Sequence, residues 1–71
     1  MILTPRQAEV VEMVARGLSN RDIAARLDIS RETVKVHVKQ AAQRIRGQAE
    51  PRERLAVWFY LTHPEARDLS I

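Results

Sequence analysis

One stretch of the chain constrains the fold more than any other, because residues 30–46 have the spacing of a two-faced helix. Ser30 has a side-chain oxygen that can cap the first turn by accepting a backbone N–H. Apolar residues then recur with the i, i+4, i+7, i+11 spacing of a buried face: Val34, Val38, Ala41 and Ile45. The pattern predicts a helix over about residues 31–46 with one side turned into a core.

The opposite face of this predicted helix is basic and rich in amides, with one valine among the polar side chains. It carries Lys35, Lys39, Gln40, Gln43 and Arg46 around Val36. DNA major grooves are read by Lys, Arg, Gln and small apolar groups together, and a thymine methyl would account for Val36. A solvated charged face with a single exposed valine explains the same pattern, because such valines are common. This helix alone favours neither interpretation.

The positive charge of the chain is concentrated on the same segment. The net charge is only +3, but residues 31–46 hold five basic side chains and one acidic one. Basic and acidic residues balance at four each over residues 1–30, and residues 47–71 hold three basic and four acidic. Such clustering is typical of a nucleic-acid surface, although it would also suit an acidic protein partner.

Composition narrows the class to one small all-α domain without enzymatic machinery. The 71 residues suit a single core, and the absence of cysteine excludes disulfides and thiolate metal sites. No cysteine or spaced cluster of carboxylates accompanies the two histidines, His37 and His63, so no metal or catalytic site is assembled. We therefore expect no enzyme activity, metal or cofactor. No apolar run reaches membrane-spanning length and no signal-peptide pattern is present, so we expect a cytoplasmic protein without a membrane partner.

Two further helices are predicted before residue 30. Thr4, Pro5 and Gln7 form a capping-box pattern, and Gly17 can end the helix that begins there, near residue 16. Its expected inward positions are Ala8, Val11, Val14, Ala15 and Leu18. Ser19 begins a short helix that ends near Leu27, followed by a three-residue turn in which Asp28 tolerates a left-handed conformation. A short helix, a tight turn and a longer basic helix make a helix-turn-helix.

A fourth helix is predicted over about residues 51–62, begun by Pro51 and rich in large apolar residues. The run Leu55–Leu61 cannot face one core throughout, because successive helical residues lie 100° apart. Leu55, Trp58 or Phe59, and Thr62 are the expected inward positions. The candidates for an outward dimer interface are Val57, Trp58, Tyr60 and Leu61. The alternative is that so small a core uses all its large residues. Residues 1–63 form the expected domain, and residues 64–71 a tail with one loose turn.

These segments together resemble a known family. The segments 3–11 and 17–24, with Leu27, Ser30 and Thr33–His37, are similar to the LuxR/GerE-type DNA-binding domain. The resemblance implies a four-helix fold whose third helix enters the major groove and whose fourth mediates dimerisation. It implies base contacts by Lys35, Val36 and Lys39, and phosphate contacts by Ser19, Asn20, Arg21, Ser30, Arg31 and Thr33. We add three candidates for the edge of the DNA contact: His37, Gln43 and Arg46. After residue 46 the connection is about two residues longer than is usual in the family.

The expected function is sequence-specific binding of double-stranded DNA by a homodimeric transcriptional regulator, with RNA polymerase as a further candidate partner. Two alternatives remain open. The segments 33–35 and 41–46 also suit a sigma-factor region-four-like domain, which binds promoter DNA without forming its own dimer. The third interpretation is a protein-interaction module that binds another regulator through the aromatic fourth helix.

Overall fold

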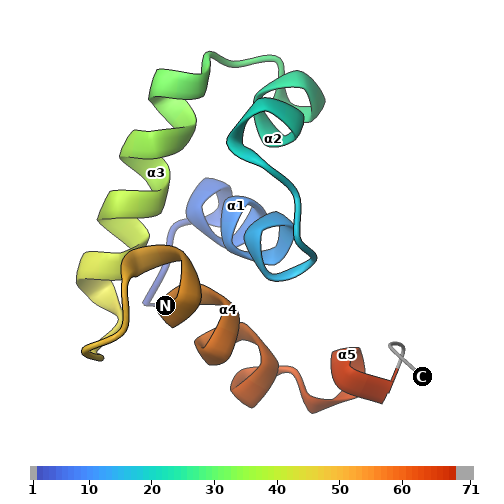
Figure 1. Cartoon of the computed structure of the whole chain (residues 1–71), viewed down its shortest axis with the longest axis vertical. Helices are drawn as coiled ribbons and strands as arrows, with labels where there is room; N and C mark the ends of the chain where they lie inside the picture. Colours follow the sequence, from blue (N-terminus) through green and yellow to red (C-terminus); the bar gives the residue numbers. More distant parts are fainter. Residues whose placement is uncertain (1, 69–71) are drawn as a thin grey trace.

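The computed structural model describes residues 2–68 and contains helices only over that range (Figure 1). The helices are α1 (Pro5–Ala15), α2 (Asn20–Leu27), α3 (Arg31–Arg44), α4 (Pro51–Thr62) and α5 (Pro64–Asp68). The predicted all-α class and its four helices are confirmed. Most of the predicted tail forms the short helix α5, and residues 69–71 lie outside the described part. None of the described helices is long and apolar enough to span a lipid bilayer.

The first three helices begin where the sequence predicts, because their capping signals are local. Thr4 Oγ1 accepts from Gln7 N at 3.1 Å, and Gln7 Oε1 accepts from Thr4 N at 3.1 Å, which completes the capping box. Ser19 Oγ and Ser30 Oγ each accept a backbone N–H from the third residue beyond them, at 3.1 and 3.0 Å. Gly17 takes a φ of +89° just after α1. Each cap satisfies a first-turn donor that would otherwise lack a partner.

Helix α1 lies at the centre of the molecule and packs against both α3 and α4, while α2 packs on α3 (Figure 1). The largest fully buried side chains are Val10, Val11, Ile23, Val34 and Leu55. The prediction that Ala8 faces the core is wrong, because Ala8 is exposed. The buried stripe of α1 instead comprises Gln7, Val10, Val11 and Val14. Gln7 can be buried because its amide oxygen is held by the capping box.

The turn between α2 and α3 has the geometry expected of a helix-turn-helix. Asp28 adopts a left-handed conformation with φ 55° and ψ 47°, as predicted. The backbone N–H of Ile29 donates to the Ala24 carbonyl at 3.1 Å, which closes the turn over the small side chain of Ala24. Ala24 itself is buried. This turn sets the direction in which α3 leaves the rest of the fold.

Helix α3 is shorter than predicted, since it ends at Arg44 rather than at Arg46. Ile45 has extended backbone angles (φ −113°, ψ 117°). Its side chain nevertheless remains buried. The chain thus leaves the helix while keeping the last apolar residue of the stripe in the core. Arg46 consequently lies beyond the helix, and a helical wheel no longer gives its direction.

Candidate nucleic-acid interface

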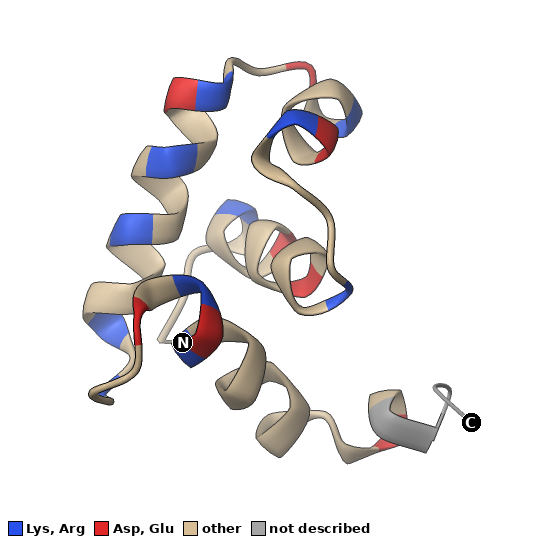
Figure 2. Cartoon of the chain, in the orientation of Figure 1, with Lys and Arg blue, Asp and Glu red and all other residues tan. Residues whose placement is uncertain are grey.

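The outer face of α3 presents the basic and apolar side chains together. Lys35, Val36 and Lys39 are all exposed, and the Val36 side chain retains 50% of its accessible surface. Val34 and Val38, on the opposite side of the helix, are buried against the other helices. Figure 2 shows basic residues recurring along α3 from its first turn to its last. The lysine-and-valine face is therefore open to a ligand while the aliphatic face anchors the helix.

The candidate phosphate contacts gather at the starts of α2 and α3. Ser19, Arg21, Ser30 and Arg31 are exposed, whereas Asn20 and Thr33 are half-buried. The Ser30 and Thr33 hydroxyl oxygens lie 2.8 Å apart and share a hydrogen bond. Helix starts carry backbone N–H groups without partners in the helix itself and a partial positive charge. Both features favour a bound anion such as a phosphate.

The three edge candidates differ in their surroundings. Gln43 is exposed and lines a shallow polar depression with Gln40, Arg44 and Gln7. His37 is half-buried, and its Nδ1 has no hydrogen-bond partner among the described residues. Arg46 is exposed but lies in the loop after α3, beside a pocket that residues of α4 also line. Gln43 thus shares the α3 surface with the two lysines, while Arg46 is separated from it by the helix end.

Two arginines of α4 reach across to other helices. Arg52 Nη2 donates to the Leu18 carbonyl at 2.6 Å, and Arg52 Nη1 donates to Asn20 Oδ1 at 2.5 Å. Arg54 Nη1 donates to the Ala42 carbonyl at 3.0 Å near the end of α3. The first arginine ties α4 to the start of α2, and the second ties it to the end of α3.

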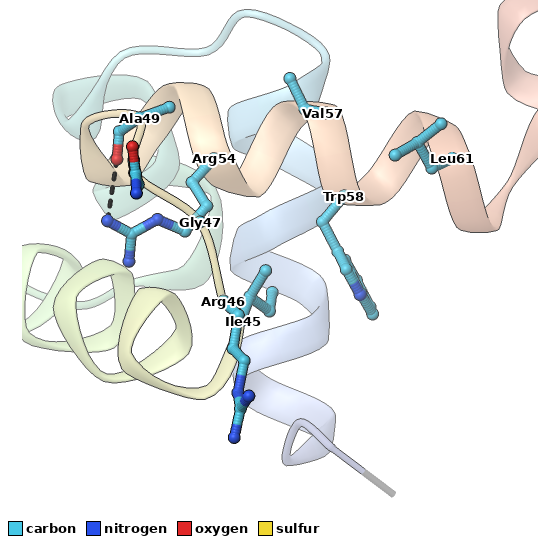
Figure 3. A pocket seen from close by; sticks show the side chains of 9 residues that line it. Ile45, Arg46, Gly47, Ala49, Arg54, Val57, Trp58 and Leu61 are labelled. Carbon is cyan, nitrogen blue, oxygen red and sulfur yellow. Dashed lines mark hydrogen bonds between the residues drawn. The ribbon is translucent and has the colours of Figure 1, made fainter.

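Arg54 also shapes the long connection between α3 and α4. Its Nη2 donates to the Ala49 carbonyl at 2.8 Å, a bond drawn in Figure 3. The loop crosses the aliphatic part of Arg54 at Gly47, where an added Cβ would lie 3.1 Å from Arg54 Cγ. The glycine therefore allows the loop to approach the arginine closely, so that the guanidinium can reach the carbonyl of Ala42 before the loop and that of Ala49 within it.

The outer surface of α4 leaves two aliphatic side chains in solvent. Val57 and Leu61, one turn apart, retain 52% and 67% of their accessible surface. They border a shallow, mainly apolar pocket that also involves Ile45, Trp58 and the loop 46–49 (Figure 3). Trp58 is half-buried at its edge.

The structure shows which residues of α4 face the core, a choice between Trp58 and Phe59 that the sequence left open. Leu55 and Phe59 are buried, whereas Thr62 is exposed, so its expected inward position is wrong. Tyr60 is half-buried, and its hydroxyl donates to the Ala15 carbonyl of α1 at 2.8 Å. This side chain therefore points toward α1 and not toward the surface formed by Val57 and Leu61.

Comparison with known proteins decides the family. The family model described as "Bacterial regulatory proteins, luxR family" matches residues 1–58, which include the helix-turn-helix and most of α4. The chain belongs to the luxR family. It is therefore a helix-turn-helix DNA-binding domain of a transcriptional regulator, and this family is not a class of enzymes. The relatives that match favour this interpretation over the sigma-factor-like and protein-interaction alternatives.

Several luxR-type regulators are similar to the chain. The nitrate/nitrite response regulator protein NarL of Escherichia coli K12 is 43% identical over 58 residues, which are 82% of this chain and 26% of NarL. The putative HTH-type transcriptional regulator Mb0914c of Mycobacterium bovis is 53% identical over 36 residues, 51% of this chain and 4% of that protein. The chain thus spans about a quarter of the length of NarL and a much smaller share of the mycobacterial regulator. No solved structure gives a significant match to the chain.

The sequence did not predict the hydrogen bonds by which Arg52 and Arg54 connect α4 to the other helices of this luxR-family domain. Both lie in the first turn of α4, where a cation is disfavoured by the positive end of the helix dipole. That unfavourable placement was a usable signal that each arginine has a specific partner. The identity of the partners, however, depends on how α4 crosses α2 and α3, which no local pattern specifies.

Proposed function

We propose that this domain binds a specific duplex DNA sequence by inserting the outer face of α3 into the major groove. The observation that carries the proposal is the exposure of Val36 between Lys35 and Lys39, on the side of α3 opposite the core. Lysines donate to guanine O6 and N7, and a valine contacts the methyl group of thymine. Gln43 adds an amide farther along the same helix. We further propose that the domain acts in transcription in the cytoplasm, with RNA polymerase as a downstream partner.

Phosphate contacts at two helix starts would hold α3 in register. Ser19 and Ser30 each cap a helix, and the backbone N–H groups of the next two residues lack partners within the helix. Arg21 and Arg31 add exposed positive charge at these two places. Such contacts position a protein on the duplex without reading its sequence.

Exchanging Lys39 and Arg31 separately for alanine tests these roles. We expect Lys39→Ala to lower affinity for a selected duplex by about tenfold, because one base contact is lost, with a smaller effect on random DNA. Arg31→Ala is expected to weaken binding to both duplexes similarly and to reduce the salt slope by about one. Fluorescence anisotropy at several salt concentrations measures all four affinities. If both variants lose specific and non-specific affinity in the same ratio, the assigned roles are wrong.

We also propose that two copies associate through the exposed surface of α4, formed by Val57 and Leu61 with Trp58 at its edge. The support is the exposure of two aliphatic side chains one turn apart beside an apolar pocket. Exposed apolar surface of this kind marks contact sites on small proteins. A dimer would place two recognition helices about one DNA turn apart, on an inverted or direct repeat.

Leu61→Asp tests the dimer. Because the carboxylate would be buried without a partner in the interface, we expect this variant to sediment as a monomer at concentrations where the unmodified domain is dimeric. Val36→Asp is the control, since Val36 is similarly exposed but lies on α3. It should leave the concentration dependence unchanged. A domain that stays monomeric at all concentrations, or a Leu61→Asp variant that still dimerises, would contradict the proposed interface.

A further inference from the structure

Arg52 connects the proposed dimerisation helix to the DNA-facing start of α2. It lies in the first turn of α4, 32 positions after Asn20, and its two terminal nitrogens divide their bonds between two acceptors. One is the backbone carbonyl of Leu18, just before the Ser19 cap, and the other is the side-chain oxygen of Asn20. The guanidinium therefore forms hydrogen bonds to the residues immediately before and after Ser19, which caps α2.

The chemistry of this contact orients the Asn20 amide. A guanidinium only donates hydrogen bonds, so the amide atom that meets Arg52 must be Oδ1. The Nδ2 group, with its two hydrogens, then points away from Arg52. A phosphate oxygen only accepts hydrogen bonds, so an amide held in this orientation offers the phosphate donors and keeps its own oxygen away from the negative charge.

The contact also places a positive charge where the fold itself disfavours one. Arg52 sits in the first turn of α4 and bonds to the first residue of α2, so it lies close to the positive ends of two helix dipoles. Within the free domain this arrangement is electrostatically costly. A phosphate at the start of α2 would offset this cost, because the guanidinium and the helix ends would all attract the bound anion.

We infer that Arg52 is a positioning residue for DNA binding, which fixes the Asn20 amide and the start of α2 so that both donate to a backbone phosphate. The inference rests on the proposed function, in which the start of α2 contacts phosphate. It assigns a role in DNA affinity to a side chain of α4 that reaches the DNA contact through Asn20.

A double-mutant cycle tests the inference, with R52A, N20A and the double variant compared with the unmodified domain. Binding to a selected duplex is measured at fixed salt, and urea unfolding is measured on the same samples. We expect R52A to lower DNA affinity about tenfold when Asn20 is present, and by less than about twofold in the N20A background. Equal losses in both backgrounds would mean that Arg52 acts only on the fold, and would overturn the inference.

Two further variants separate positioning from stability. N20D keeps an oxygen for Arg52 but removes the Nδ2 donor, so we expect an unfolding midpoint at or above that of the unmodified domain and a DNA affinity below that of N20A. R52K keeps the charge but lacks the fork that reaches both acceptors. R52K should recover only part of the DNA affinity lost in R52A. If R52A fails to fold, the double-mutant cycle is measured with R52K in its place.

The outcomes also distinguish this inference from the proposed function. If the unmodified domain binds no duplex at low salt, the proposed function fails. If it binds a selected duplex while N20D binds as well as the unmodified domain, only the role of Arg52 and Asn20 is overturned.

Discussion

Val36→Asp is expected to lower affinity for a selected duplex by on the order of 100-fold or more. The substitution replaces a thymine contact by a carboxylate that must enter a groove walled by phosphates, without a partner to neutralise it. Fold stability should change by less than about 0.5 kcal/mol, because the position is half-exposed and Val and Asp have similar helix propensities. Anisotropy titrations, with circular dichroism on the same samples, measure both quantities.

Val57→Asp is the matched control for this experiment. Its exposure, 52% against 50% for Val36, is nearly the same, but it lies on α4. The same change in charge at Val57 should therefore disrupt association of two copies while leaving binding to a single half-site close to that of the unmodified domain. Comparable losses on a single half-site from both variants would show that net charge, and not the α3 face, controls binding.

Leu55→Ala is expected to destabilise the fold by about 2–5 kcal/mol. Leu55 is among the largest fully buried side chains and extends from α4 into the core cluster. A domain of this size has a total stability of only about 4–11 kcal/mol, so this single change would leave a substantial fraction unfolded near physiological temperature. Urea denaturation followed by circular dichroism gives the free energy of unfolding.

Ile2→Ala provides the comparison for the core substitution. Ile2 is of similar size but retains 55% of its accessible surface near the start of the chain. Its truncation should cost less than about 0.5 kcal/mol. If the two substitutions cost the same, Leu55 is not part of a close-packed core, and the described position of α4 is wrong.

The features that the sequence predicted correctly are those whose signals are local. Thr4, Ser19 and Ser30 each form a cap with a partner three residues away, so the pattern contains both halves of the interaction. The outward position of Lys35, Val36 and Lys39 follows from helical periodicity once the buried stripe of α3 is recognised. The candidate DNA-binding face was predictable for that reason.

The features that the sequence did not predict depend on contacts between helices. Ala8 was placed inward and is exposed, because the side of α1 that is buried depends on how α3 and α4 pack against it. Helix α3 ends two residues earlier than predicted, near the point where Arg54 of α4 donates a hydrogen bond to the Ala42 carbonyl. Tyr60 bonds to α1 through its hydroxyl, a partner 45 positions away. Periodicity gives no information about such distant partners.

The most direct test of the central claim is an isotope-edited NOE experiment on the domain bound to a duplex selected from random DNA. The methyl groups of Val36 should show NOEs to major-groove protons, including a thymine methyl, while those of Val57 and Leu61 show none to the bases. Val36 methyl groups without any NOE to DNA, in a complex where residues of α1 or α4 contact the bases, would contradict the claim that α3 reads the sequence.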